Sequence, residues 1–263
     1  MYKYLIALAY NGKNFHGWQI QPNAKTIQED LQTALSVILR QKICITGAGR
    51  TDTGVHATFY IADFDSNFEI TDTEKLTKNL NGYLSKDIVI YKIFEIENNF
   101  NSRFQALYRT YNYFIAKQKT PFYSDFSLFF PHKLNVEKMN EACKILFDYK
   151  NFKSFEKLHS DNKTSNCVIF KAEWKETGNF LVFEIKADRF LRNMVRSIVG
   201  TMLDVGQSKI SIEDFKAIIE AQNRSAAGVS VLPNGLFLTD IQYPQPINDK
   251  LKDVRMNTKL GFC

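Results

Sequence analysis

The order in which two hydrophobic periodicities alternate along the chain constrains its fold more than any other feature. Apolar residues at every second position indicate four strands in the first part of the chain, over 2–10, 42–47, 56–64 and 88–96. Apolar residues at every third or fourth position indicate helices over 27–38 and 73–84, and Thr26 with Glu29 forms a capping box before the first helix. The predicted order is therefore β-α-β-β-α-β, which is that of a ferredoxin-like unit.

The second part of the chain repeats this type of order. We expect strands over 104–117, 166–175, 179–187 and 236–243, and helices over 135–148, 189–205 and 211–222. No linker rich in glycine, serine or proline marks the joint near residue 98, so we expect two halves that pack together, 1–98 and 99–246, before a polar, loosely ordered tail, 247–263. The predicted fold class is α+β, with two ferredoxin-like or RRM-like halves around a mainly antiparallel sheet that has helices on one side.

Composition limits the classes of protein to which the chain can belong. Its 263 residues are 44% hydrophobic and 24% charged, which excludes a disordered or fibrous chain. No run of about 20 apolar residues predicts a membrane span. The four cysteines show neither metal-binding nor disulfide spacing, so we expect a cytoplasmic protein without a metal site. The net charge of +6 favours a polyanionic partner.

A loop punctuated by glycines is the densest functional signal. From residue 47 to residue 56 its sequence is Gly-Ala-Gly-Arg-Thr-Asp-Thr-Gly-Val-His. The loop is not a dinucleotide-binding fingerprint, because Asp52 stands where that pattern needs a glycine, and no Gly-Lys-Ser/Thr completes a P-loop. It offers a carboxylate between an arginine and a histidine. The alternative is a tight turn in which Asp52 caps its own backbone.

Two further segments carry concentrated positive charge. Residues 100–123 contain four basic side chains, eight aromatic rings and no acidic residue, which suits phosphate contacts and base stacking; the alternative is a strand whose rings fill the core. Arg189, Arg192 and Arg196 have the spacing of one helical face near a predicted helix start, where the helix dipole favours anions. A bound anion or a buried carboxylate would explain this stripe, and a solvated charged face is the alternative.

Taken together, these segments resemble the TruA-type tRNA pseudouridine synthases. The loop over 47–57 resembles the signature of that family, and the other similar segments are 10–19, 103–113, 190–200, 224–228 and 235–244. The resemblance extends from residue 2 to about residue 244. The chain departs from the family pattern at Asn11, where an aspartate is usual, at Thr53, where an alanine is usual, and at Ser-Val-Leu-Pro over 230–233, where Thr-Ala-Pro-Ala is usual.

The resemblance implies an isomerase that uses no metal and no nucleotide cofactor. The family's reaction cleaves the bond from C1′ to N1 of uridine, rotates the uracil and rejoins it through C5. By position, Asp52 is the catalytic aspartate, and Arg196 pairs with Asp52 in a cleft between the halves. Tyr111 stacks on the target uracil and is also the candidate catalytic base that removes the C5 proton. Arg50 is expected to bind the RNA backbone near the flipped nucleotide. The remaining candidates for substrate binding are Thr51, His56, Arg109 and Arg192.

The resemblance also implies a substrate and an assembly. The substrate is tRNA, modified at uridines 38, 39 and 40 of the anticodon stem-loop, and the assembly is a homodimer. Attack of the Asp52 carboxylate on C1′, its addition to C6 and removal of the 2′ proton are alternative chemical roles. Two other classes of function stay open: a non-catalytic RNA-binding module of RRM-like halves, and a small-molecule phosphate enzyme that holds an anion in the glycine loop.

Overall fold

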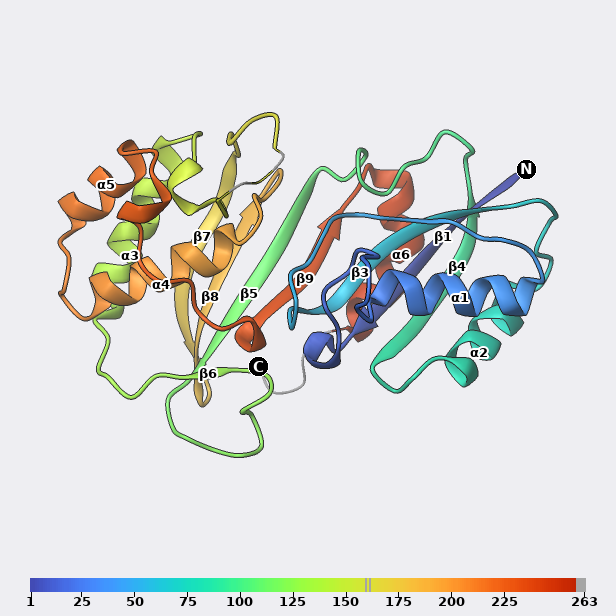
Figure 1. Cartoon of the computed structure of the whole chain (residues 1–263), viewed down its shortest axis with the longest axis horizontal. Coiled ribbons are helices and arrows are strands. Elements are labelled where there is room, and N and C mark those ends of the chain that lie inside the picture. The colour runs from blue at the N-terminus through green and yellow to red at the C-terminus, as the bar shows by residue number, and fades with distance from the viewer. Residues whose placement is uncertain (159, 161, 259–263) are drawn as a thin grey trace. The chain divides into compact units, whose positions relative to one another are not determined.

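The computed structural model describes residues 1–158, 160 and 162–258. The chain divides into two compact units, one made of Met1–Leu107 with Phe237–Cys263 and the other of Tyr108–Leu236. Both units combine strands with helices, which confirms the predicted α+β class (Figure 1). The boundary lies at Leu107 rather than near residue 98, and the chain returns to the first unit at Phe237 because its last strand pairs there.

The first unit contains five strands. They are β1 (Tyr2–Tyr10), β2 (Ile45–Gly47), β3 (His56–Ser66), β4 (Ile88–Ile96) and β9 (Leu236–Gln242). Their order is β4-β1-β3-β9, and β2 pairs with β3. The pairings of β1 with β3 and β4, and of β2 with β3, are antiparallel, whereas β9 is parallel to β3. The strands lie where the alternating pattern predicts them, although β2 is shorter than expected.

Three helices belong to this unit: α1 (Ile27–Leu39), α2 (Thr73–Tyr83) and α6 (Gln245–Asn257). The helix α1 begins as predicted, because the Thr26 side chain accepts a hydrogen bond from the N–H of Glu29. The side chain of Asp72 accepts from the N–H of Lys75 in the same way and starts α2.

Different helices cover the two faces of β3. Phe59 and Tyr60 are successive residues of β3, so their side chains point to opposite faces. Trp18, which leads into α1, stacks on Tyr60 with ring centroids 4.1 Å apart, whereas the guanidinium of Arg255 in α6 lies 4.9 Å over the ring of Phe59. The sequence predicts helices on one side of the sheet only. Helices α1 and α2 lie on one side and pack on each other, whereas α6 lies on the other face (Figure 1).

The described residues of the second unit form four strands and three α-helices. They are β5 (Tyr108–Ala116), β6 (Leu128–Phe129), β7 (Ile169–Thr177), β8 (Phe180–Ala187), α3 (Val136–Ile145), α4 (Met194–Gly206) and α5 (Ile212–Glu220). The order is β5-β8-β7 with antiparallel pairings, and β6 is parallel to β5. In the described ranges, no helix is long and apolar enough to cross a bilayer.

The core of the second unit lies under one face of its strands. Tyr113, Phe183 and Trp174 are opposite one another on β5, β8 and β7, and all three are buried. The indole N–H of Trp174 lies 3.2 Å from the Met202 sulfur in α4, and the thiol of Cys143 in α3 contacts the same sulfur. Helices α3 and α4 therefore cover this face and position the start of α4 beside β5.

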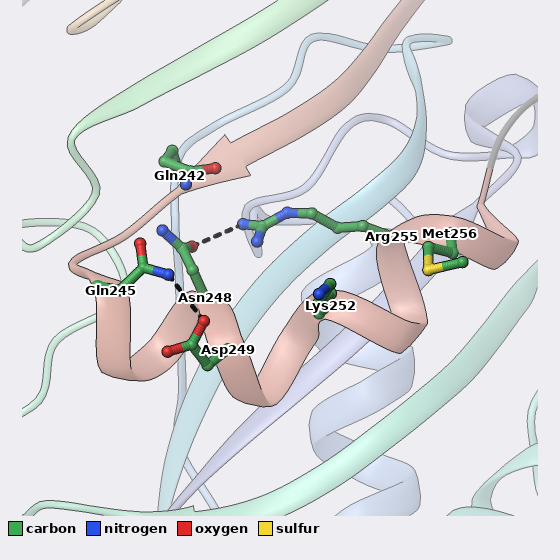
Figure 2. A pocket seen from close by; sticks show the side chains of 7 residues that line it. All are labelled: Gln242, Gln245, Asn248, Asp249, Lys252, Arg255 and Met256. Carbon is green, nitrogen blue, oxygen red and sulfur yellow. Dashed lines mark hydrogen bonds between the residues drawn. The ribbon is translucent and has the colours of Figure 1, made fainter.

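The helix α6 replaces the loosely ordered tail that the sequence predicts from residue 247. The Arg255 guanidinium bonds to the amide oxygen of Asn248 at 2.9 Å (Figure 2). It also bonds to the carboxylate of Asp240 at 2.9 Å and to the carbonyl of Ile241 at 2.6 Å. A hollow of about 380 Å³ lies beside these groups, and its lining contains none of the predicted site residues. Residues 259–263 of the predicted tail lie outside the described part of the chain.

We expect Arg255→Met to destabilise the first unit by about 1–3 kcal/mol, because the part-buried partners of the guanidinium lose a charged donor. Thermal unfolding followed by circular dichroism measures this as a melting temperature lowered by about 2–4 °C per kcal/mol. Lys252→Met changes an exposed residue of the same helix and is the matched control. Equal melting temperatures for the two variants would show that these bonds do not hold α6.

Candidate active site

Asp52 lies on the loop over 48–55 that joins β2 to β3. The N–H of Ala48 bonds to the carbonyl of Ile61 at 2.9 Å, and the N–H of Val55 bonds to the carbonyl of Asp52 at 3.1 Å, so both ends of the loop are held by the main chain. Asp52 is half-buried, while Arg50 is exposed. The loop therefore presents its arginine to solvent and keeps its carboxylate partly desolvated.

Two tyrosine hydroxyls from neighbouring strands hold the backbone just before Asp52. The Tyr60 hydroxyl donates to the carbonyl of Gly49 and accepts from the N–H of the same residue. The Tyr10 hydroxyl lies 2.9 Å from the hydroxyl of Thr51. A side chain at Gly47 would collide with both Tyr60 and the indole of Trp18, so glycine is needed there for the stacked rings to lie under the loop.

The loop after β1 packs directly on the loop that carries Asp52. The N–H of Trp18 bonds to the carbonyl of Thr51 at 3.2 Å, and the N–H of Gly54 bonds to the carbonyl of Phe15 at 3.3 Å. Gly17 has φ +88°, and a side chain there would also meet the carbonyl of Thr51. The departure at Asn11 keeps a capping role, because its side chain accepts from the N–H of Lys13 and starts a short 3₁₀ turn.

Thr51 and His56 are both buried. Thr51 is 7% exposed and bonds to Tyr10 and to the backbone of Trp18. His56 is 1% exposed, accepts a hydrogen bond at Nδ1 from the N–H of Gly12 at 3.1 Å, and stacks on Phe237. Their geometry favours a role in positioning the loop over direct contact with a substrate.

In the second unit, Tyr111 lies on β5 beside the turn that precedes α4. Its half-buried ring meets Phe190 edge to face, with centroids 5.1 Å apart and an interplanar angle of 89°. Arg109, two residues earlier on β5, donates to the carbonyl of Asp188 at 2.8 Å. Strand β5 and the turn over 188–193 thus bring an aromatic ring and a guanidinium to one place.

Arg196 lies in the first turn of α4 and is half-buried. Its Nε donates to the carbonyl of Val231 at 2.8 Å, while its own carbonyl accepts from the N–H of Val231 at 3.2 Å. The hydroxyl of Tyr113 donates to the carbonyl of Leu232 at 2.8 Å, and burial raises the pKa of Tyr113, which keeps it a donor. These bonds fix the direction in which the Arg196 side chain leaves the helix.

Ser230 explains one departure from the family pattern. Its hydroxyl accepts from the amide of Asn193 at 2.6 Å and from the guanidinium of Arg224 at 2.9 Å. Serine and the usual threonine both supply this hydroxyl. The segment 228–232 is therefore tied to the start of α4 by side-chain bonds as well as by the main chain.

Comparisons with known proteins agree with this geometry. A family model described as tRNA pseudouridine synthase matches residues 6–105 and 142–244. The chain belongs to the tRNA pseudouridine synthase family. Relatives named tRNA pseudouridine synthase A come from Parabacteroides distasonis (50% identical over 95% of this chain and all of the relative), Azobacteroides pseudotrichonymphae (52%, over 93% and 98%) and Bacteroides thetaiotaomicron (46%, over all of both).

Membership of this synthase family makes the chain an isomerase of the class that converts uridine of tRNA into pseudouridine. The resemblance inferred from the sequence is thereby confirmed, and the non-catalytic RNA-binding alternative is not supported. Among the described residues, no group of three or more histidine, cysteine, aspartate or glutamate side chains is placed to hold a metal ion.

The predicted arginine stripe on a helical face is wrong. The helix α4 begins at Met194, because Asn193 has a left-handed conformation with φ 65° that cannot be part of a right-handed helix. Arg189 and Arg192 lie in the preceding turn, where the N–H of Lys157 bonds to the carbonyl of Arg192 at 3.0 Å. Arg192 is exposed, and of the three arginines Arg196 lies within α4.

Sequence reasoning missed the groups that hold the synthase site in place. Tyr60 stacks on Trp18 and Ser230 accepts from Asn193, partners that are far away in the sequence, and no local pattern marks such pairs. A usable signal was the glycine at position 47, whose missing side chain implies a close approach by other groups. The pairing of Arg196 with Asp52 joins a residue from each unit and stays a prediction.

We expect Tyr60→Phe to loosen the Asp52 loop without unfolding the first unit, because only the hydroxyl bonded to Gly49 is removed. Hydrogen exchange of a peptide over 48–55 should become faster by about fivefold or more, corresponding to loss of a bond worth about 1 kcal/mol. Tyr4→Phe is the matched control, since that buried hydroxyl accepts from the N–H of Ile70 instead. Unchanged exchange in the Tyr60 variant would contradict this role of the hydroxyl.

Proposed function

We propose that this chain isomerises uridine to pseudouridine at positions 38, 39 and 40 in the anticodon stem-loop of tRNA, with Asp52 as its catalytic carboxylate. The family match over residues 6–105 and 142–244 carries the proposal. The loop that holds Asp52 on hydrogen bonds from β1, β3 and the first loop supports it, since a catalytic group must be held in a fixed position.

Asp52 acts on the ribose or ring of the target nucleotide while the bond from C1′ to N1 is broken. The uracil then turns and rejoins through C5. The C5 proton leaves to solvent and N1 takes up a proton, so substrate and product are isomers. A half-buried carboxylate suits this work, because partial exclusion of water strengthens its interaction with a developing positive charge on the sugar.

Tyr111 stacks on the flipped uracil. Removing a base from its stack costs a few kcal/mol, and stacking on an aromatic ring returns about 1–3 kcal/mol. Phe190 packs edge to face against Tyr111, which holds the ring in one orientation and lowers the cost of ordering it.

Arg196 pairs with Asp52 and keeps the carboxylate ionised and oriented. The hydrogen bond from its Nε to the carbonyl of Val231 fixes the side chain and orients the rest of the guanidinium. Arg50, Arg109 and Arg192 bind phosphates of the RNA, and the exposed Arg50 and Arg192 suit that contact best. Thr51 and His56 position the catalytic loop from beneath.

Recognition of the stem-loop rests on shape and phosphates, because one enzyme must accept three neighbouring positions in varied sequences. The net charge of +6 supports this mode of binding. The chain acts as a homodimer in the cytoplasm, where its tRNA substrate is found. Size-exclusion chromatography with light scattering tests the assembly: a mass near 61 kDa, about twice 30.4 kDa, is expected, and a monomer mass would contradict it.

We expect Asp52→Asn to abolish tritium release from C5-labelled uridine in tRNA, because the neutral amide cannot act as base or nucleophile. Binding of tRNA, measured by filter retention, should stay within about threefold of wild type, since the phosphate contacts remain. Asp253→Asn alters an exposed carboxylate on α6 and serves as the control. Tritium release by the Asp52 variant at the wild-type rate would refute the assignment.

We expect Arg196→Ala to lower turnover by about 100-fold or more, which is the usual effect of removing one charged donor at a reacting centre. Added guanidinium ion should restore part of the rate, because the missing group is supplied from solution. A melting temperature close to that of wild type would exclude unfolding as the cause. Wild-type turnover in this variant would show that Arg196 does not act on Asp52.

A further inference from the structure

The turn after β4 is anchored with unusual strength for a surface segment. The N–H of Ser102 donates to the carboxylate of Asp63 on β3 at 2.8 Å, and its hydroxyl donates to the carbonyl of Thr46 on β2 at 2.9 Å. The carbonyl of Ser102 accepts from the hydroxyl of Tyr243 at 2.7 Å. Every polar group of this fully buried serine is therefore bonded to a different part of the first unit.

The anchor includes a buried charge. Asp63 is 2% exposed, and its other carboxylate oxygen accepts from the Lys3 ammonium at 3.2 Å. Removing a carboxylate from water is costly unless it is paired and hydrogen-bonded. Because the Asp63 carboxylate accepts a hydrogen bond from the backbone of the turn, it holds the turn in one position.

At its tip, the anchored turn presents an aromatic ring to solvent. The Asn101 side chain accepts from the N–H groups of Arg103 at 3.0 Å and of Phe104 at 3.1 Å. The ring of Phe104 is 78% exposed, and the Arg103 guanidinium lies 5.6 Å from its centroid. The sequence predicts a strand over 104–117 that starts at Phe104, but β5 begins at Tyr108 and leaves 102–104 free to form the turn.

We propose that Arg103 and Phe104 form a second base-binding site, in which an unpaired base of the tRNA stacks on Phe104 while Arg103 binds a neighbouring phosphate. This inference rests on the proposed function for the identity of the RNA. An exposed aromatic ring beside a guanidinium is the combination that proteins use for unpaired nucleotides. The rigid turn adds affinity because little side-chain and backbone freedom is lost on binding.

The site is separate from the stack on Tyr111. Phe104 belongs to the first unit, and its anchor at Thr46 lies on β2, the strand that leads directly into the Asp52 loop. Because the proposed function assigns the isomerised uracil to Tyr111, the base on Phe104 is assigned to a neighbouring nucleotide. Positive charge beside the ring favours RNA over an apolar protein partner.

Phe104→Trp tests the site by fluorescence. Trp18 and Trp174 are 3% and 2% exposed, so iodide should quench the added indole selectively. Saturating tRNA should lower the Stern–Volmer constant of this variant at least threefold. Phe68→Trp, at a 47% exposed phenylalanine two residues after the end of β3, should not respond. An unchanged Stern–Volmer constant for the Phe104 variant would overturn the proposal. Protection that appears without RNA and grows with protein concentration would also overturn it, because it would indicate self-association.

Affinity gives an independent test. Phe104→Ala should raise the Kd for tRNA about 5- to 100-fold, and Phe104→Tyr should restore binding, because stacking needs the ring alone. Arg103→Ala should lower the slope of log K against log salt by about one. Phe68→Ala is the control for loss of an exposed ring. A wild-type Kd for Phe104→Ala would overturn the stacking site.

Tritium release by wild type on the same tRNA separates this inference from the proposed function. Tritium release by wild type, without protection of the indole in Phe104→Trp from iodide, would refute the second base site alone. Protection without any release would refute the isomerase and leave the stacking site in place. Failure of wild type to bind tRNA would refute both.

Discussion

The stack of Trp18 on Tyr60 beneath Gly47 is the contact on which the candidate active site depends. It brings the loop after β1 under the loop that carries Asp52, and it places the Tyr60 hydroxyl at Gly49. Main-chain bonds from Trp18 and Gly54 then close the two loops onto each other. The loop that carries the carboxylate is thus held by aromatic packing and neutral hydrogen bonds, which do not weaken with salt as exposed ion pairs do.

In the second unit, the proposed site residues are also held in place, here by hydrogen bonds around the start of α4. The segment 228–232 lies on the start of α4 because Arg196, Tyr113 and Ser230 each bond within it or to it. Arg196 is oriented by a backbone carbonyl, and Tyr111 by the edge of Phe190. In both units, residues proposed to touch the substrate are positioned by groups that do not. Such support matters because a displacement of about 1 Å at a reacting centre can cost about 100-fold in rate.

Hydrophobic periodicity predicted most of the elements, because each strand or helix buries one face and its pattern is local. It failed where a single backbone angle or a tertiary bond decides the outcome. The left-handed conformation of Asn193 moves the start of α4 past Arg189 and Arg192, and no pattern around residue 193 signals it. The polar segment after residue 247 forms α6 because Leu251 and Val254 are buried and Arg255 bonds to Asp240. Asp52, Tyr111 and Arg196 were accessible through a family resemblance, whereas Tyr60 and Ser102 owe their roles to partners distant in sequence.

The two-unit synthase therefore presents its proposed RNA contacts on strand β5 and on loops and turns whose backbones are held by hydrogen bonds. Mapping pseudouridine at single-nucleotide resolution in an unmodified tRNA transcript, after incubation with the wild-type chain alone, tests this most directly. New pseudouridine confined to positions 38, 39 and 40 of the anticodon stem-loop is the expected result. A transcript that gains none, or gains it only outside the stem-loop, would contradict the proposed reaction or its proposed site.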